Sequence, residues 1–262
     1  MNIRVLGCHG STALLNSSTR NPECNTCGFL LNGTVLLDAG TIAAKLRFEE
    51  QKQIRHVLLS HLHFDHIKGL PAFADNLSQD FDSPVTIAAL PQVILGLKRH
   101  IFNSVVFPDF FTIPTAESAI FVAQMIDAGK SCRVEEFEIT PILVNHTVPA
   151  AGFIIRAQSA TLLYSGDTYV TDELWSAAQR IPDLKAAFIE CSYPNAKKDL
   201  AQISKHLTPA LLAAEFRKLG REDIALYPYH LKPAYKDQIV RELTELHLPS
   251  LSVLEEGQTI SV

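Results

Sequence analysis

The six residues from His61 to His66 constrain this chain more than any other stretch of its sequence. They read His-Leu-His-Phe-Asp-His, so three imidazoles and one carboxylate fall within six positions. In an extended loop, His61, His63 and Asp65 share one side and His66 turns away, so the loop can offer ligands to two adjacent metals. Neutral imidazole and carboxylate suit zinc, and also manganese or iron.

A surface tag or a chance cluster is the alternative interpretation of this motif. Apolar Leu62 and Phe64 alternate with the polar residues, and an apolar run from His56 to Leu59 precedes them. A buried strand that delivers a loop of metal ligands explains both features. The sequence therefore predicts a metal site, and two metals would need more ligands than this loop supplies.

Further candidate ligands stand at the ends of later apolar runs, where a scaffold holds side chains firmly. His146 follows the run from Ile142 to Val144, Asp167 follows Tyr164-Ser165-Gly166, and His230 follows Tyr229. Taken alone, each is more typical of a capping or hydrogen-bonded residue than of a ligand. Together with the first cluster, the three complete a plausible set.

The pattern of apolar runs predicts one α/β domain over residues 1–262, with two packed sheets and helices outside. Asn32-Gly33 lies between two apolar runs and indicates a tight hairpin. Helical patterns cover residues 92–102, 117–125, 209–219 and 235–246. Residues 103–131 lie between the candidate ligands His66 and His146, and we expect them to form an insertion that serves as a lid or a dimer contact.

Composition limits the possible partners. The chain of 262 residues is 47% hydrophobic and 19% charged, which is ordinary for a globular protein. Its formal net charge is −5 and no block of basic residues is present, which disfavours a stable nucleic-acid partner. No signal peptide or membrane-spanning run is visible, so we expect a cytoplasmic protein without a membrane partner.

The order HxHxDH, His, Gly-Asp and His resembles the metallo-β-lactamase superfamily. More narrowly, several segments resemble class II 3′,5′-cyclic-nucleotide phosphodiesterases, and the same layout is similar to the related tRNase Z enzymes. These segments are SHLHFDHIKGL (60–70), HIFNSVVFPDF (100–110), ECSYPN (190–195), HLTP (206–209) and HLKP (230–233). The resemblance implies an αββα sandwich, with two mixed sheets and helices on the outer faces.

The resemblance also implies roles for individual residues. His61, His63 and His146 would bind one metal, Asp65, His66 and His230 the second, and Asp167 would bridge both. Asp38 matches an aspartate that orders the metal loop, although a plain turn residue at a strand end is the alternative. Glu190 and His206 match a pair near the leaving group, so the expected catalytic residues are Asp65, His206 and Glu190.

These roles predict hydrolysis of a cyclic nucleotide to its 5′-monophosphate by a hydroxide that bridges two divalent ions, with Zn²⁺ preferred and Mn²⁺ or Fe²⁺ as alternatives. His206 would give a proton to the leaving oxygen. A tRNase Z-like endonuclease, another hydrolase of the superfamily, and a noncatalytic nucleotide sensor remain as alternatives. Relatives are often dimers, so the resemblance also implies a homodimer.

For two other features we prefer a structural role to a functional one. Cys24 and Cys27 form a single CxxC, which supplies at most two of the four ligands of a structural zinc, so we expect reduced cysteines near the start of a strand. The aromatic segment from Phe107 to Pro114 could stack on a base, but core or dimer packing is the expected role.

Overall fold

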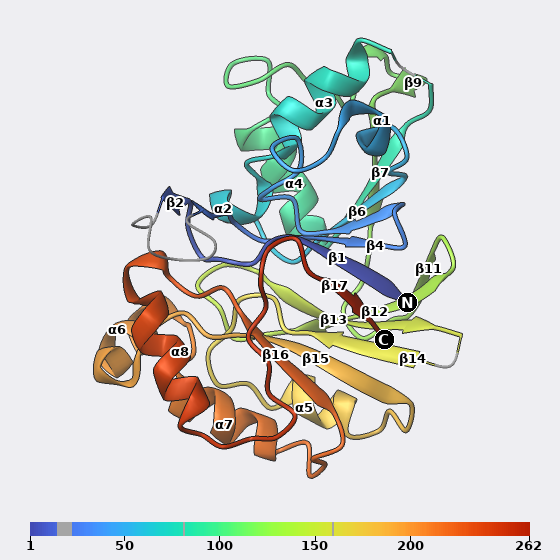
Figure 1. Cartoon of the computed structure of the whole chain (residues 1–262). Helices are drawn as coiled ribbons and strands as arrows, with labels where there is room; N and C mark the ends of the chain where they lie inside the picture. The colour runs from blue at the N-terminus through green and yellow to red at the C-terminus, as the bar shows by residue number, and fades with distance from the viewer. Residues whose placement is uncertain (15–22, 81, 159) are drawn as a thin grey trace.

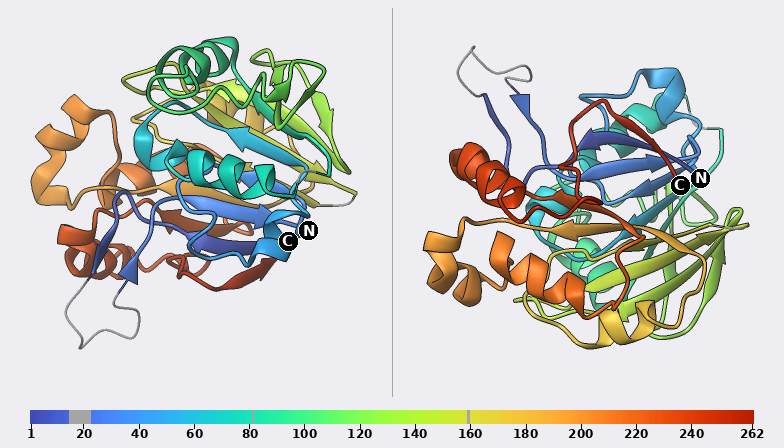
Figure 2. Two further views of the ribbon diagram at one scale, coloured as in Figure 1. Left: turned by 90° about the horizontal axis from the view of Figure 1, so that it is seen from above. Right: turned by 60° about the horizontal axis from the view of Figure 1, so that its bottom comes forward.

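Two mixed sheets form the centre of the computed structural model, which describes residues 1–14, 23–80, 82–158 and 160–262. The first sheet has the strand order β10-β7-β6-β5-β4-β1-β17. Its strands are β1 (Asn2–Gly7), β4 (Gly28–Leu31), β5 (Val35–Leu37), β6 (His56–Leu59), β7 (Val85–Ala89), β10 (Phe121–Met125) and β17 (Thr259–Ser261). Strand β17 pairs with β1, so the two termini lie side by side (Figures 1 and 2).

The second sheet comes from the later part of the sequence, with the order β11-β12-β13-β14-β15-β16. Its strands are β11 (Cys132–Val134), β12 (Phe137–Leu143), β13 (Ala151–Ala157), β14 (Ala160–Tyr164), β15 (Leu184–Glu190) and β16 (Ala225–Tyr229). Two short pairs lie outside the large sheets: β2 (Ala13–Leu14) with β3 (Glu23–Cys24), and β8 (Pro114–Thr115) with β9 (Ser118–Ala119).

Helices cover the outer face of each sheet (Figure 1). Those on the first sheet are α1 (Phe48–Gln51), α2 (Phe64–Ile67), α3 (Leu70–Ser78) and α4 (Pro91–His100). Those on the second are α5 (Glu173–Ala178), α6 (Lys198–Ser204), α7 (Pro209–Arg217) and α8 (Lys236–Thr244), with 3₁₀ turns at Asn195–Lys197 and Pro233–Tyr235. The predicted αββα sandwich is therefore confirmed. No helix in the described ranges is long and apolar enough to cross a membrane.

Phe29 on β4 joins the two sheets. Its ring packs edge-on against Tyr164 on β14, Phe188 on β15 and Tyr229 on β16, with ring centroids 5.5–5.8 Å apart. A second buried cluster, which includes Trp175, Phe216 and Ile239, lies between the second sheet and α5, α7 and α8. Each sheet thus buries both faces, which explains the nearly continuous apolar strands of the sequence.

Local signals predicted several elements well. The hairpin at Asn32-Gly33 is confirmed: β4 and β5 pair antiparallel, and both turn residues have positive φ, 47° and 81°. Helices α4, α7 and α8 match three of the predicted helical ranges. Thr208 caps α7, where its side chain accepts a hydrogen bond from the backbone nitrogen of Leu211.

The predicted helix at 117–125 is wrong. Residues Phe121–Met125 form β10, which pairs parallel with β7 along the edge of the first sheet. Phe121 is buried against Phe73, Phe102 and Phe111, so tertiary packing overrides the local pattern. Part of residues 103–131 thus belongs to the sheet, and a role as a lid or dimer contact stays a prediction.

The aromatic segment before β10 packs into the core, as expected. Phe110 and Phe111 are both buried, and their rings meet Phe102 at 6.4 and 5.8 Å between centroids. These rings are therefore occupied by packing and leave no free face for a base.

Candidate metal centre

The strand topology brings the ends of distant strands to one edge of the molecule. Strands β12 and β14 are both antiparallel to β13, and β14, β15 and β16 run parallel to one another. The carboxyl ends of β12, β14, β15 and β16 therefore point the same way. His146, Asp167 and His230 follow three of these strands, and Glu190 ends the fourth.

The metal loop reaches this edge from the first sheet. Strand β6 is buried from Val57 to Leu59, and Ser60 and His61 continue it with no exposed surface. His63 is extended, with φ −65° and ψ 145°, and the four-residue helix α2 begins directly after it. The short helix turns His66 into the interior while Asp65 stays at the rim.

Asp38 holds this loop in place through hydrogen bonds. It lies after β5 with φ 55°, is fully buried, and accepts hydrogen bonds from the backbone nitrogen and the Oγ of Ser60, both at 2.8 Å. The Tyr164 hydroxyl donates to its Oδ2 at 2.5 Å, and His66 Nδ1 does so at 2.7 Å. The expected loop-ordering role of Asp38 agrees with these four contacts.

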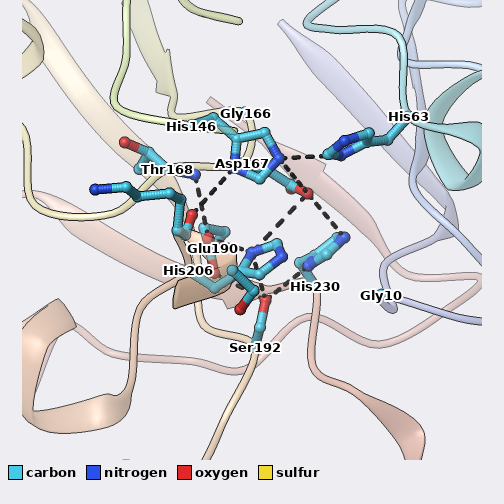
Figure 3. Close-up of polar contacts among 12 residues, drawn as sticks. Gly10, His63, His146, Gly166, Asp167, Thr168, Glu190, Ser192, His206 and His230 are labelled. Carbon is cyan, nitrogen blue, oxygen red and sulfur yellow. Dashed lines mark hydrogen bonds and ion pairs between the residues drawn. The ribbon is translucent and has the colours of Figure 1, made fainter. Parts of the chain in front are cut away.

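Asp167 lies at the centre of the candidate ligands, and Figure 3 shows it beside three of them, His63, His146 and His230. Its carboxylate oxygens are 3.3 Å from His66 Nε2, 3.3 Å from His230 Nε2 and 3.6 Å from His61 Nε2. His146 Nε2 is 4.0 Å away and lies 3.0 Å from His63 Nδ1, while Asp65 Oδ2 is 3.3 Å from His230 Nε2. The structure therefore brings all seven predicted ligands together.

Four of the imidazoles are oriented by a hydrogen bond on their Nδ1 side. His66 donates to Asp38, and His146 donates to the carbonyl oxygen of Lys205 at 3.1 Å. His61 Nδ1 lies 2.9 Å from Ser60 Oγ, and His230 Nδ1 lies 2.8 Å from Ser192 Oγ.

Both serine hydroxyls already donate to carboxylates, Ser60 to Asp38 and Ser192 to Glu190. The imidazoles of His61 and His230 must therefore donate to them from Nδ1. Every one of the four rings thus keeps a lone pair on Nε2, the form that binds a metal.

Buried polar atoms without a partner test whether a cation fits here. His61 Nε2, His66 Nε2 and Asp167 Oδ1 are buried and have no hydrogen-bond partner among the described residues. Such orphaned atoms are costly unless something compensates them. His61 Nε2 and His66 Nε2 both face the Asp167 carboxylate, at 3.6 and 3.3 Å, so divalent cations bound beside it would satisfy all three atoms.

The pKa shifts of most of the candidate ligands favour the protonation states that bind a metal. Burial lowers the pKa of His61, His63, His146 and His230, so their neutral, metal-binding forms are favoured. Burial would raise the pKa of Asp167, but the surrounding imidazoles, His230 first, hold it well below its usual range. His66 is the exception: burial opposes its charge, yet Asp167 and Asp38 raise its pKa well above normal, so its charged form is favoured and it would have to lose the Nε2 proton to bind a metal.

Glu190 and His206 form a pair beside the cluster. His206 Nδ1 lies 2.8 Å from Glu190 Oε1, and Glu190 is fully buried. The backbone nitrogen of Thr168 donates to the same oxygen at 3.1 Å, and Ser192 Oγ donates to the other at 2.9 Å. Burial opposes protonation of His206, but the Glu190 carboxylate raises its pKa.

Sequence reasoning assigned no role to several residues that complete the site. Ser60 and Ser192 orient imidazoles, and Lys232 Nζ lies 3.9 Å from Asp65 Oδ2 while it donates to the Gly10 carbonyl at 2.7 Å. Ser192 and Lys232 stand inside the segments ECSYPN and HLKP, which was the available signal.

The two cysteines of the CxxC are buried and unpaired, as expected. The Sγ atom of Cys27 lies near His66 and His230, in a group whose ligand atoms are within 4.8 Å of one another, and 3.7 Å from the carbonyl oxygen of His9. Sequence reasoning did not anticipate that Cys27 would lie so close to the cluster, because nothing in the CxxC spacing relates it to residues 66 and 230.

Comparison with known families identifies the family to which this chain belongs. Residues 34–231 match the family described as beta-lactamase superfamily domain, a match that spans most of the chain. The chain belongs to this family. The matched range contains all seven candidate ligands together with Asp38, Glu190 and His206.

Two curated relatives are phosphodiesterases by name. The chain is 26% identical over 258 residues to 3′,5′-cyclic-nucleotide phosphodiesterase 1 of Saccharomyces cerevisiae, covering 82% of this chain and 69% of the relative. It is also 26% identical over 236 residues to a probable 3′,5′-cyclic-nucleotide phosphodiesterase of Yersinia pestis, covering 81% and 65%. The chain thus spans about two thirds of the length of these relatives.

Solved structures share the fold. The unliganded yeast PDE1 superposes with a TM-score of 0.80 at 21% identity, covering 98% of each chain. The short form of human tRNase Z gives a TM-score of 0.68 at 20% identity, covering 100% of this chain and 99% of the other. Family, relatives and site together support a metal-dependent hydrolase of the β-lactamase superfamily.

Proposed function

We propose that this hydrolase cleaves 3′,5′-cyclic nucleotides to 5′-monophosphates with two divalent metal ions. One observation carries the proposal: six imidazole and carboxylate side chains surround the Asp167 carboxylate, and the Glu190–His206 pair lies directly beside it. The names of the relatives from yeast and Yersinia pestis support the same substrate class.

The seven residues would divide between two ions. His61, His63 and His146 would hold one ion, Asp65, His66 and His230 the other, and Asp167 would contribute to both. A set dominated by imidazole favours Zn²⁺, with Mn²⁺ or Fe²⁺ as alternatives. Bound divalent ions supply an activated water and neutralise the negative charge of a phosphodiester.

His206 would hold the proton that the departing 3′ oxygen requires. Its Nδ1 faces Glu190, so Nε2 would be the atom that donates. Burial opposes the charged imidazole, but Glu190 raises its pKa and so favours that form, and Ser192 and Thr168 in turn hold the Glu190 carboxylate in place.

Lys232 adds positive charge at the opposite rim of the cluster. Its Nζ atom lies 3.9 Å from Asp65 Oδ2 and is partly exposed, so the ammonium faces the region where an anionic phosphate would sit. The chain carries a net charge of −5, yet Lys232 places a positive charge at this rim and bound divalent ions would add to it, which favours a small anionic substrate at the site.

Product analysis with a substrate panel tests the proposal. Protein loaded with Zn²⁺ is incubated with cAMP, cGMP, cCMP, cUMP and a precursor tRNA, and metal-stripped protein serves as the control. We expect a 5′-monophosphate from at least one cyclic nucleotide and no product without metal. A trimmed tRNA alone would favour the tRNase Z-like alternative, and tight binding without product would favour a sensor.

The homodimer implied by the resemblance belongs to the same proposal. Sedimentation of the full chain measures it directly, and we expect a mass of twice 28.9 kDa. A monomer at micromolar concentration would contradict it without affecting the proposed chemistry.

A further inference from the structure

A cavity of about 620 Å³ opens beside the metal cluster and has no role in the chemistry described so far. It is formed by the start of α4, the loop after β10 and the loop between β12 and β13. His146 is both a wall of this cavity and a member of the group that could hold a metal ion. The cavity and the metal cluster therefore adjoin at His146.

We propose that this cavity holds the nucleoside portion of the substrate while the phosphate lies at the metal cluster. The inference rests on the proposed function and extends it to a base-binding subsite. Its volume lies within the range of about 300–1,000 Å³ that is usual for small-molecule sites.

The walls suit an uncharged, flat group. Leu90, Leu143 and Val148 supply apolar surface, and Leu143 is 52% exposed. Among the described residues, no lysine or arginine lines the cavity, so it provides no cationic side chain to bind a phosphate. The ring faces of a nucleobase need this kind of apolar contact.

The polar atoms at the rim suit the edge of a base. Gln92, at the start of α4, carries an amide that both donates and accepts hydrogen bonds. Asp127, on the facing loop, is an acceptor, and its carboxylate is oriented by Lys130 at 3.0 Å. A few polar groups on apolar walls are typical of a specific ligand site.

A second cavity lacks this combination of apolar walls and a neighbouring metal cluster. A space of about 690 Å³ is lined by residues that include Arg4, Lys45 and Glu50, and none of the seven candidate ligands borders it. Its charges are already paired, with Arg4 at 2.7 Å from Glu50 and Lys45 at 2.9 Å from Glu23. The cavity beside His146, by contrast, combines apolar walls with contact to a member of the metal cluster.

Two variants test the subsite, Leu143→Ala and Gln92→Ala. Leu95→Ala is the matched control, because Leu95 on α4 is 58% exposed and does not line the cavity. All three residues are exposed, so the variants should fold like the parent chain. Each is assayed with the cyclic nucleotides and with an abasic 3′,5′-cyclic ribose phosphate, which has the same reacting group but no base.

We expect the cavity variants to raise KM for the preferred cyclic nucleotide about ten-fold with kcat retained, because the lost contacts bind ground and transition state equally. The abasic substrate should change less than about two-fold, since it makes no base contact to lose. Binding of a non-hydrolysable cyclic phosphorothioate, measured by calorimetry, should weaken by the same factor as KM rises.

Two results would overturn the subsite. One is an unchanged KM in both cavity variants while the parent chain turns over cyclic nucleotides; the other is an equal loss for the abasic substrate. If the parent chain turned over no cyclic nucleotide, the proposed function itself would fail, and the subsite that depends on it would fail too.

Discussion

The Nε2 atom of His146 lies 3.0 Å from the Nδ1 atom of His63, although 83 residues separate them in the chain. His146 donates its Nδ1 hydrogen to the Lys205 carbonyl, so its Nε2 presents a lone pair toward His63. These two imidazole nitrogens lie close together beside Asp167 and would supply two of the ligands of a bound cation.

His63→Ala should remove a metal ion and abolish turnover. The substitution deletes one of the few donors of its group, so the remaining side chains bind the ion more weakly. Elemental analysis of purified protein measures the loss directly. His56→Ala is the control, because His56 lies at the start of β6 and contacts Glu135 instead of the cluster. Full metal content in the His63 variant would contradict the ligand assignment.

His206→Ala should keep the metal content and slow cleavage by about 10²–10⁴-fold, the usual contribution of a positioned general acid. The imidazole faces Glu190 at 2.8 Å and lies 4.0 Å from Asp167, and its nitrogen is within 4.8 Å of ligand atoms of Asp167 and His230, so the variant also tests whether His206 is a ligand. Metal analysis beside single-turnover kinetics separates the two effects. If the variant emptied the site, His206 would be a ligand instead of an acid.

Ser192→Ala should weaken metal binding by about 10–100-fold, as expected when the partner of a ligating histidine is lost. The hydroxyl lies between His230 Nδ1 at 2.8 Å and Glu190 Oε2 at 2.9 Å, so its removal takes away the partner of His230 Nδ1, while Glu190 Oε2 still accepts from the Leu207 backbone nitrogen at 3.3 Å. A zinc titration against a chelator measures the affinity. Ser204→Ala, whose hydroxyl bonds only the Leu200 carbonyl within its own helix, should retain the parent affinity.

Phe29→Ala should lower the free energy of unfolding by about 3–5 kcal/mol, because it opens a cavity at the contact between the sheets. The ring is fully buried and meets three aromatic rings of the second sheet. Urea unfolding at constant protein and metal concentration gives the value. A loss below about 1 kcal/mol would mean that the sheets are held together mainly elsewhere.

Acid should destabilise the fold partly through Glu256. Burial opposes its charged form, but His9 and Asn25 hydrogen-bond the carboxylate and lower its pKa below 4.5. A lowered pKa in the folded state stabilises the protein above pH 4.5, and this contribution is lost as the pH falls through the folded-state pKa.

Glu256→Gln should therefore lose less stability than the parent chain between pH 6 and pH 3, measured by urea unfolding. Asp199→Asn, at an exposed position on α6, serves as the control and should follow the parent curve. Parallel curves for the parent chain and the Glu256 variant would show that this carboxylate does not contribute to acid sensitivity.

The sequence by itself determined the features that depend on short-range chemistry. Six residues with four donors predicted the metal loop, and Asn32-Gly33 predicted the hairpin, because ligand spacing and turn geometry are local properties. The resemblance carried by the longer segments predicted the αββα fold, which the structure and the family match confirm. The ligand and acid roles of the individual residues stay predictions.

Only the tertiary structure decided how distant segments meet. Residues 121–125 have a helical pattern, yet they form an edge strand because β7 offers unpaired backbone groups and Phe121 fits among buried aromatic rings. Ser192 bridges Glu190 and His230, and Lys232 lies near Asp65, because parallel strands bring their ends to one edge. Such contacts depend on strand order and packing across the whole chain, which no local pattern of residues encodes.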